Sequence, residues 1–262
     1  MGMPLVTLTT DFGTRDPYVA AMKGVLAAWC PEAHVIDLTH QIGPQDLIET
    51  ALFLAATTPL FPENTIHIAV VDPGVGTDRR AIVAKANDQY YVCPDNGILT
   101  VLLQNYPLQA AHAITNPAFM RDEISDTFHG RDIFAPAAGR IANGTPLSEA
   151  GPVAENLETL GLSDPVVERD RVTGRVVHVD RFGNCITNIR RNLVTMTDVC
   201  EIRSSNHVFR GIARTYGQVP KGSPLALFGS MNLLELAVSQ GSAAAVLHME
   251  RGTEVTVVFP RQ

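Results

Sequence analysis

The sequence lacks the features that would place the protein in a membrane or in an oxidising compartment. Its longest apolar stretch, residues 51–62, is broken by two threonines and a proline and is shorter than the ~20 residues of a spanning helix. No basic segment followed by an apolar one opens the chain. The 4 cysteines lie far apart and form no CxxC pair. We therefore expect a soluble protein of the cytoplasm, without a membrane partner and with reduced thiols.

Positive charge and the common metal and phosphate motifs are also scarce. The net charge of −7 argues against a nucleic acid partner. The 8 histidines form no HxH, HxxxH or HExxH spacing, so no metal site is predicted. Neither GxxxxGK nor a strand-linked GxGxxG is present, which leaves a phosphate-cradling loop without support.

What the sequence does contain is typical of a globular protein. Hydrophobic residues make up 45% of its 262 residues and charged residues 18%. Before Gly161, short β-rich runs alternate with helical periodicity, which predicts a largely parallel sheet with helices on both faces. The expected strands are residues 5–9, 34–38, 65–71, 81–85 and 89–93, and the expected helices begin at Asp16-Pro17 and cover 46–56, 95–105 and 132–143. The nearly all-apolar run 65–71 is expected in the middle of the sheet.

After Gly161 the pattern changes to short β-branched segments between turn residues. The expected strands are residues 175–179, 186–189, 199–203, 207–210, 224–228 and 253–259, with one helix at 232–239. This pattern predicts a second, mostly β domain, a small barrel or sandwich. The fold class is thus α/β, with an N-terminal Rossmann-like α/β domain at residues 1–162 and a C-terminal small β-barrel domain at residues 172–262.

Three N-terminal loops fall at predicted strand-to-helix edges, where open α/β sheets bind ligands. They carry Asp11 beside a glycine turn, Asp72 before Pro-Gly-Val-Gly, and His129 just ahead of a helix. Each has a purely structural alternative. Asp11 could close an Asx-turn, Asp72 could belong to a common turn, and His129 could be half-buried without function. For Asp16, helix capping alone is the favoured interpretation.

Two C-terminal segments also carry candidate ligand groups. In Asp180-Arg181-Phe182-Gly183-Asn184, the aromatic ring could stack on a purine and the amide could pair with the edge of adenine. The favoured alternative is a hairpin turn with Phe182 in the core. Ser230, in a segment that we expect to open a helix, would offer a hydroxyl and backbone N–H groups to a carboxylate. Its alternative is an ordinary helix cap.

Taken together and in order, seven motifs that span nearly the whole chain resemble one family. They are LTTDFGTRDPYVAAMKG, VIDLTHQI, VDPGVGTDRR, CPDNGILT, FHGRDIFAPAAGRIANG, DRFGNCITNI and GSMNLLELA. The family is that of the S-adenosyl-L-methionine hydroxide adenosyltransferases, the water-using relatives of fluorinase and chlorinase. The resemblance implies hydrolysis of S-adenosyl-L-methionine to adenosine and L-methionine, with no cofactor. It also implies a homotrimer whose active sites lie between subunits.

The resemblance further implies a role for individual residues. The catalytic set would be Asp72, Arg79 and His129, with Arg80 as the alternative to Arg79. Whether His129 or Asp72 takes the proton of water stays open. The substrate-binding set would be Asp11 for the ribose hydroxyls, Asp16 and Asp180 for the methionine ammonium, Phe182 and Asn184 for adenine, and Ser230, next to Met231, for the methionine carboxylate.

Three positions depart from the halide-using members. Those enzymes have a Tyr where this chain has Asp72 and a Ser where it has Gly130, which favours water here. They also carry an Arg in place of Met231, so part of the carboxylate recognition must come from elsewhere. Two alternatives remain: a non-catalytic protein that binds S-adenosyl-L-methionine or adenosine, and a halide-dependent 5′-halo-5′-deoxyadenosine synthase.

Overall fold

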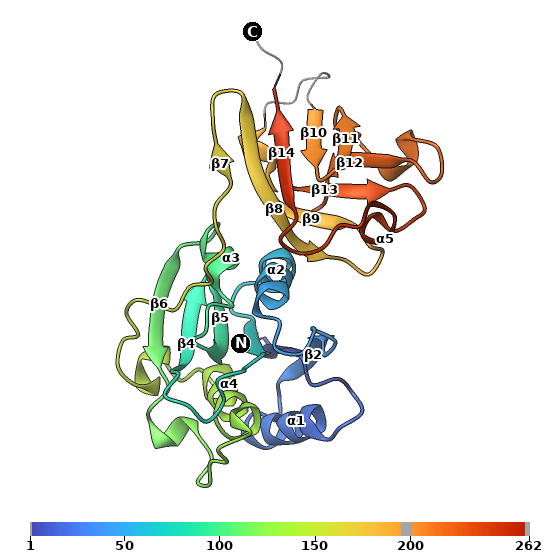
Figure 1. Ribbon diagram of the computed structural model, residues 1–262. Helices are drawn as coiled ribbons and strands as arrows, with labels where there is room; N and C mark the ends of the chain where they lie inside the picture. Colours follow the sequence, from blue (N-terminus) through green and yellow to red (C-terminus); the bar gives the residue numbers. More distant parts are fainter. Residues whose placement is uncertain (1, 195–200, 260–262) are drawn as a thin grey trace. The chain divides into compact units, whose positions relative to one another are not determined.

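Hydrogen bonds between strands build two separate sheets, one in each half of the chain (Figure 1). The structure, a computed structural model, describes residues 2–194 and 201–259. It divides after Leu160 into an N-terminal and a C-terminal unit. The predicted class, an α/β domain followed by a mostly β domain, is confirmed. No helix among these residues is both long and apolar enough to cross a membrane.

The N-terminal sheet is mixed and has the strand order β2-β1-β3-β5-β4-β6. Its strands are β1 Leu5–Thr10, β2 His34–Thr39, β3 Ile66–Val70, β4 Ala81–Ala86, β5 Gln89–Pro94 and β6 Leu108–Ala113. The pairs β1–β2, β1–β3 and β3–β5 are parallel, whereas β4 runs antiparallel to both β5 and β6. As predicted, β3 lies inside the sheet, and all five of its residues are buried.

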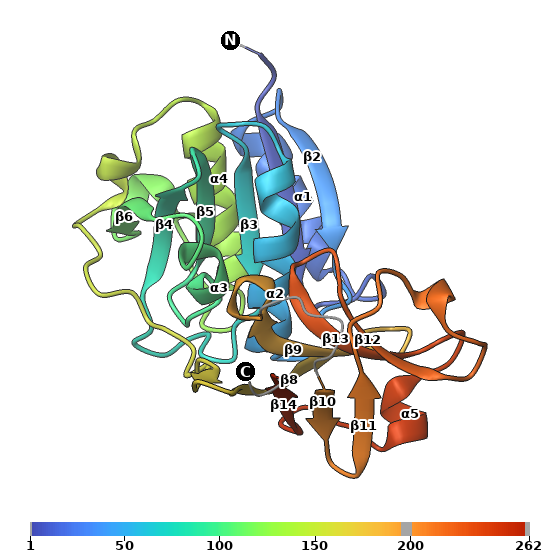
Figure 2. The same ribbon diagram turned by 90° about the horizontal axis from the view of Figure 1, so that it is seen from above.

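Helices cover both faces of this sheet because its strands present apolar side chains alternately to either side. The helices are α1 Tyr18–Trp29, α2 Leu47–Thr57, α3 Thr100–Leu103 and α4 Ala135–Ala142. On one face, Met22 and Leu26 of α1 pack with α4 against Leu8. On the other face, Leu54 of α2 and Leu102 of α3 share a second core. Figure 2 shows α1 beside α4 and α2 beside α3.

In the N-terminal unit, one predicted helix is wrong in extent and one strand was missed. The helix expected at 95–105 shrinks to the single turn α3, because the side chains before it bind elsewhere. Asp95 accepts a hydrogen bond from Arg80 at 2.8 Å, and Asn96 donates to the carbonyl of Val71 at 2.9 Å. Gly97 then takes a positive φ of 93°. The edge strand β6 was not predicted, since its alanine-rich sequence has little β-propensity of its own.

The expected capping role of Asp16 is also wrong. Pro17, not Asp16, is the N-cap residue of α1, and no side chain caps this helix. Asp16 lies exposed on the surface one position too early to reach the first free N–H groups. Its carboxylate is therefore not needed to build α1.

The C-terminal unit contains one strongly curved sheet in the order β11-β10-β14-β8-β9-β13-β12. Its strands are β8 Arg171–Val179, β9 Cys185–Arg190, β10 Glu201–Ser204, β11 His207–Arg210, β12 Pro224–Phe228, β13 Leu233–Val238 and β14 Glu254–Val258, with the short β7 Val166–Val167 paired to β8. The two ends of this order, β11 and β12, come into contact. The sheet thereby approaches a barrel, as predicted. The first residues of the strand expected at 199–203, and Cys200, lie outside the described residues.

The helix expected at 232–239 is wrong. These residues form strand β13, which is hydrogen-bonded to β12 on one side and to β9 on the other. Leucine, glutamate and alanine favour helices locally, but pairing on both edges outweighs propensities of a few tenths of a kcal/mol. Leu234, Leu236 and Val238 alternate into the barrel core. The only α-helix of this unit among the described residues, α5 Ala243–Leu247, was not predicted.

Burial in the N-terminal core sets the stability of the sheet that carries the site loops. Leu8 of β1 is fully buried, whereas Leu60 is 82% exposed. We expect Leu8→Ala to lower the free energy of unfolding by about 2–5 kcal/mol, because it leaves a cavity between β1 and α1. The matched change Leu60→Ala should stay within about 0.5 kcal/mol. Urea denaturation followed by circular dichroism measures both, and equal losses would contradict the packing described here.

Candidate active site

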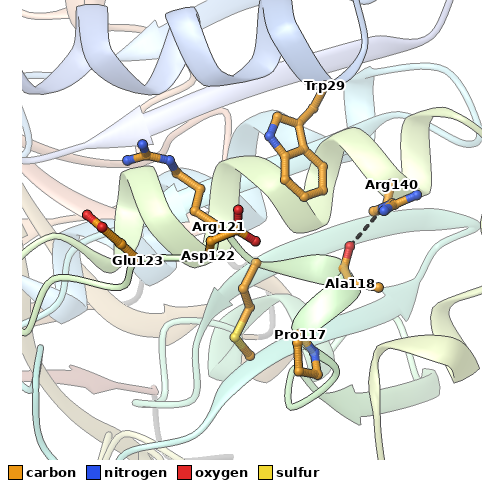
Figure 3. A pocket seen from close by; sticks show the side chains of 8 residues that line it. Trp29, Pro117, Ala118, Arg121, Asp122, Glu123 and Arg140 are labelled. Carbon is orange, nitrogen blue, oxygen red and sulfur yellow. Dashed lines mark hydrogen bonds between the residues drawn. The ribbon is translucent and has the colours of Figure 1, made fainter.

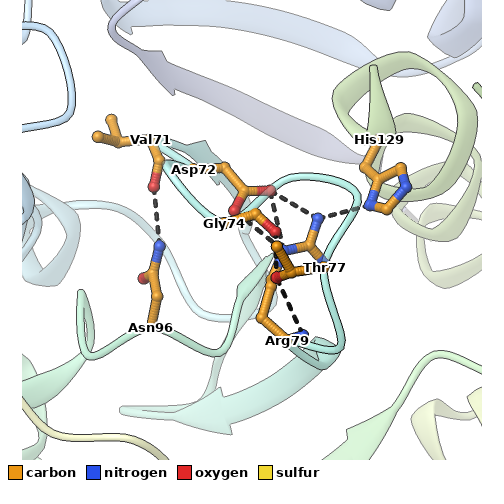
Figure 4. Close-up of polar contacts among 7 residues, drawn as sticks. All are labelled: Val71, Asp72, Gly74, Thr77, Arg79, Asn96 and His129. Atoms are coloured by element: carbon orange, nitrogen blue, oxygen red, sulfur yellow. Dashed lines mark hydrogen bonds and ion pairs between the residues drawn. The ribbon is translucent and has the colours of Figure 1, made fainter. Parts of the chain in front are cut away.

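The carboxyl ends of two neighbouring parallel strands bring the first two predicted loops together. In the pairing of β1 with β3, Thr10 stands opposite Val70. The residues that follow, Asp11 and Val71-Asp72, therefore leave the sheet at the same edge. The amide of Asn96, which follows β5, donates to the carbonyl of Val71 and fixes the end of this strand (Figure 4).

Arg79 joins two of the predicted catalytic side chains (Figure 4). Its Nε donates to Asp72 Oδ1 at 2.9 Å, and its second terminal nitrogen donates to Asp72 Oδ2 at 2.6 Å. The same terminal nitrogen lies 2.6 Å from His129 Nδ1. The side chains of Asp72 and Arg79 are only 5% and 10% exposed. The structure thus brings Asp72, Arg79 and His129, separated by up to 57 positions in sequence, into one hydrogen-bonded chain.

The contact with Arg79 fixes the state of His129. A guanidinium has only donors, so Nδ1 must accept with its lone pair, and the neutral ring carries its hydrogen on Nε2. Burial, together with the positive charge of Arg79, lowers the pKa of His129 below its ordinary value, against the opposing charges of Asp72 and Asp132. The imidazole is therefore held neutral and presents Nε2–H as a donor.

Arg80 has a different set of partners. Its Nε donates to Asp95, and its terminal nitrogens donate to the carbonyls of Glu155 and Asn156. Of the two adjacent arginines, Arg79 is the one that contacts Asp72 and His129.

Glycine is required in the loop that leads from Asp72 to Arg79. Gly76 has a φ of 77°, and a Cβ at this position would lie 2.4 Å from the backbone oxygen of Asp126. The hydroxyl of Thr77 closes the turn by donating to the carbonyl of Gly74 at 2.6 Å. The loop therefore packs directly against the segment that precedes His129.

Asp11 does not close its own turn. Its Oδ2 accepts a hydrogen bond from the backbone of Gln45 at 2.8 Å, and Thr10, not Asp11, bonds the amide of Phe12. Phe12, Tyr18 and Phe128 form an aromatic cluster with ring centroids 5.3–6.0 Å apart. This cluster links the Asp11 loop, the start of α1 and the segment that carries His129.

In the C-terminal unit, Asp180 organises the turn between β8 and β9. Its carboxylate accepts hydrogen bonds from the backbones of Phe182 and Asn184 and from the Asn184 amide, at 2.8–2.9 Å. The hairpin turn is therefore as the structural alternative predicted, but the placement of Phe182 in the core is wrong. Its ring is 77% exposed and offers an open aromatic face.

Ser230 and Met231 lie in the tight turn between β12 and β13, not at a helix N-terminus. Residues 233–238 form strand β13, so no helix begins after Ser230. The free N–H groups of a helix N-terminus, which we expected to bind a carboxylate, are therefore absent at this turn. A Cβ on Gly229 would overlap the carboxylate of Glu235, so a larger residue at the start of the turn would force that side chain to move. Ser230 is exposed and Met231 is half-buried.

Two carboxylates near these loops were missed by the sequence analysis. Glu235 is 6% exposed and accepts a hydrogen bond from the Tyr216 hydroxyl at 2.7 Å. Burial raises its pKa, and the negative charge of Asp180 adds to this shift. Asp132 is buried between two arginines. For Glu235, the available signal was a single acidic residue inside the otherwise apolar run LLELAV. Asp132 stands directly before the apolar run IFAPAA, which is a weaker signal.

Other possible sites are less suited to activating water. Within residues 2–194 and 201–259, no group of three His, Cys, Asp or Glu side chains could hold a metal ion. A surface pocket of the N-terminal unit lies near the end of α1, where Arg140 stacks over Trp29 at 5.2 Å and donates to the carbonyl of Ala118 (Figure 3). None of the predicted site residues lines this pocket.

Comparison with known proteins identifies the family. Residues 6–151 match the SAM hydroxide adenosyltransferase N-terminal domain, and residues 174–256 match the corresponding C-terminal domain. The chain belongs to the SAM hydroxide adenosyltransferase family.

Individual relatives cover almost the whole chain. An "(R)-S-adenosyl-L-methionine hydrolase" of Salinispora arenicola is 40% identical over 97% of both chains. A fluorinase of Actinoplanes is 25% identical over 98% of both chains. Among solved structures, an uncharacterized conserved protein from Thermotoga maritima has a TM-score of 0.89 at 38% identity, covering 97% of this chain and 99% of that one.

The packing around Gly130 bears on the choice between water and halide within this family. A Cβ at Gly130 would lie 3.1 Å from the sulfur of Met22 and 3.3 Å from the ring of Phe128. A serine here, which the resemblance described above assigns to the halide-using members, would require one of these side chains to move. The packing at this position therefore favours glycine over a residue with a side chain.

Replacing Arg79 should raise the pKa of His129. In Arg79→Met the positive charge that lowers this pKa is lost, and the negative charge of Asp72 acts without compensation. The neighbouring change Arg80→Met is the matched control, because Arg80 binds Asp95 instead. Titration of ¹³C-labelled histidine by NMR measures both. A His129 pKa that stays the same or falls in Arg79→Met would contradict the assigned contact.

Proposed function

We propose that this protein hydrolyses S-adenosyl-L-methionine to adenosine and L-methionine by in-line attack of water at C5′. The observation that carries the proposal is the hydrogen-bonded chain of Asp72, Arg79 and His129 at the edge of the sheet. The names of the relatives at 40% identity support the same substrate and reaction.

The leaving group makes this reaction feasible without a metal. The sulfonium departs as a neutral thioether and takes the C–S electron pair with it, so no acid has to protonate it. The nucleophile is the difficult partner, because free water has a pKa of about 15.7. Water becomes strongly acidic only as its oxygen bonds to C5′, so a carboxylate in contact with it is a sufficient base at that moment.

The geometry favours Asp72 over His129 as the proton acceptor. The single lone pair of the neutral imidazole already accepts from Arg79. Among the described residues, Asp72 Oδ1 accepts only from Arg79 Nε, and it has a second lone pair. In the proposed step, Asp72 Oδ1 takes the proton of a water whose oxygen lies roughly 3–3.5 Å from C5′. Arg79 keeps Asp72 ionised and oriented, and His129 holds Arg79 through Nδ1.

The remaining residues would hold the substrate. Asp11 would bind the ribose hydroxyls, and the exposed ring of Phe182 would stack on adenine beside Asn184. Asp16, which does not cap α1, and Asp180 would bind the ammonium group of the methionine moiety. The Asp180 carboxylate also accepts hydrogen bonds from three N–H groups of its own turn. Ser230, next to Met231, would bind the carboxylate.

We further propose a cytoplasmic homotrimer with active sites between subunits. The buried free thiols Cys30, Cys93 and Cys185 suit a reducing compartment. Light scattering after size-exclusion chromatography measures the assembly directly.

Incubation of the protein with S-adenosyl-L-methionine in H₂¹⁸O should give methionine and adenosine with the label in the 5′-hydroxyl. The label follows because the new C–O bond forms with water. Liquid chromatography with mass spectrometry detects both products. Binding without turnover would favour the non-catalytic alternative, and 5′-chloro-5′-deoxyadenosine formed in chloride would favour the halide-dependent one.

Asp72→Asn should lower kcat by about 10²–10⁴-fold, because the amide cannot accept the proton of water. Adenosine affinity, measured by calorimetry, should change little, since Asp72 faces the water and not the nucleoside. Asp95→Asn removes an arginine-paired carboxylate outside the proposed set and serves as the control. A kcat of Asp72→Asn equal to that of the unmodified protein would exclude Asp72 as the base.

A further inference from the structure

The segment that carries His129 is closed at both ends by one buried side chain. We call residues 121–132 the His129 loop. Asp132, at its end, has a fully buried side chain. Its Oδ1 accepts from Arg121 at 2.8 Å and from Arg131 Nε at 2.7 Å. Its Oδ2 accepts from Arg131 at 2.8 Å and from the backbone of Ser125 at 3.0 Å.

These contacts hold the beginning, the middle and the end of the loop. Arg121 stands at its start and Ser125 a third of the way along, and the backbone of Arg121 also donates to the carbonyl of Asp132 at 2.9 Å. A carboxylate without these donors would be costly to bury. Burial raises the pKa of Asp132, but the hydrogen bonds from Arg131, Ser125 and Arg121 outweigh it, and the pKa is lowered overall.

From Asp132 the constraint reaches His129 along two short routes. The backbone amide of Asp132 donates to the carbonyl of Phe128, the residue before His129, at 3.2 Å. The guanidinium of Arg131 lies over the Phe128 ring, 5.1 Å from its centroid. The residues after His129 form a π-helical turn, Gly130–Phe134, a local geometry that is frequent at functional sites.

The middle of the His129 loop also contacts the loop that carries Arg79, the hydrogen-bond partner of His129. The backbone oxygen of Asp126 fills the space that a side chain on Gly76 would need. The loop that presents Asp72 and Arg79 therefore rests on the His129 loop, and a shift of either one changes the distance between Arg79 and His129.

We infer that Asp132 is a positioning residue for His129: it fixes the loop so that the imidazole meets Arg79, the partner of the proposed base Asp72. This inference rests on the proposed function. A residue that served folding alone would change stability in every background, whereas a positioning residue changes the rate only while His129 is present.

A double-mutant cycle tests this difference. Asp132→Asn alone should lower kcat by roughly 10–100-fold with little change in KM, because a small misplacement costs that much. In the His129→Ala background the same change should lower kcat by no more than about twofold further. Multiplicative losses in the double variant, or an unchanged kcat in Asp132→Asn, would overturn the inference.

A milder pair of variants guards against failure to fold. Arg121 and Arg140 both line the surface pocket of Figure 3, but only Arg121 binds Asp132. Arg121→Met should lower kcat by about 3–10-fold, and Arg140→Met should change it by less than about twofold. Equal effects of the two changes would contradict the role of Asp132.

A readout without substrate separates this inference from the proposed function. The negative charge of Asp132 raises the pKa of His129, so Asp132→Asn should lower it in an NMR titration of labelled histidine. If the unmodified protein fails to hydrolyse S-adenosyl-L-methionine, the proposed function is lost, but a lowered His129 pKa still supports the coupling. An unaltered His129 titration in Asp132→Asn overturns it.

Discussion

One guanidinium determines the chemistry of the N-terminal loops. Arg79 donates to a carboxylate and to an imidazole at once, and it cannot lose its proton. It therefore fixes Nδ1 of His129 as an acceptor and leaves Nε2–H facing outward. A lysine would offer a single nitrogen and could not reach both partners in this planar, forked geometry. The protonation pattern of the site thus depends on Arg79 rather than on the histidine itself.

The fold has to hold this ion pair in place, because charges with so little exposure are stable only with their partners. Parallel pairing of β1 with β3 places Asp11 and Asp72 at one edge of the sheet. The third component, His129, arrives on a separate loop that contacts the first through Gly76. The loop of Asp72 and Arg79 and the loop of His129 are anchored separately and must meet within hydrogen-bond distance. This requirement explains why many hydrogen bonds around the site hold the backbone of these two loops in place.

The sequence predicted those parts of the fold that depend on local pattern. The apolar run at 65–71 indicated a central strand, and alternation after Gly161 indicated a β domain. The prediction from sequence was wrong where contacts with distant segments determine the secondary structure. Residues 232–239 carry helix-forming side chains but form a strand that is paired on both edges. The helix expected at 95–105 failed for the same reason, since Asp95 and Asn96 bind Arg80 and Val71.

The same limit applies to the site, where carboxylates of one chemical type have opposite environments. Asp132 lies between two arginines and its pKa is lowered, whereas burial and the negative charge of Asp180 raise the pKa of Glu235. The sequence motif identified Asp72 because this residue follows the end of a strand. The motif did not show whether a buried carboxylate lies near positive or negative side chains. That information is created only when segments far apart in sequence pack together. A residue such as Asp132, which contacts no expected ligand, can therefore be recognised only from its four donors.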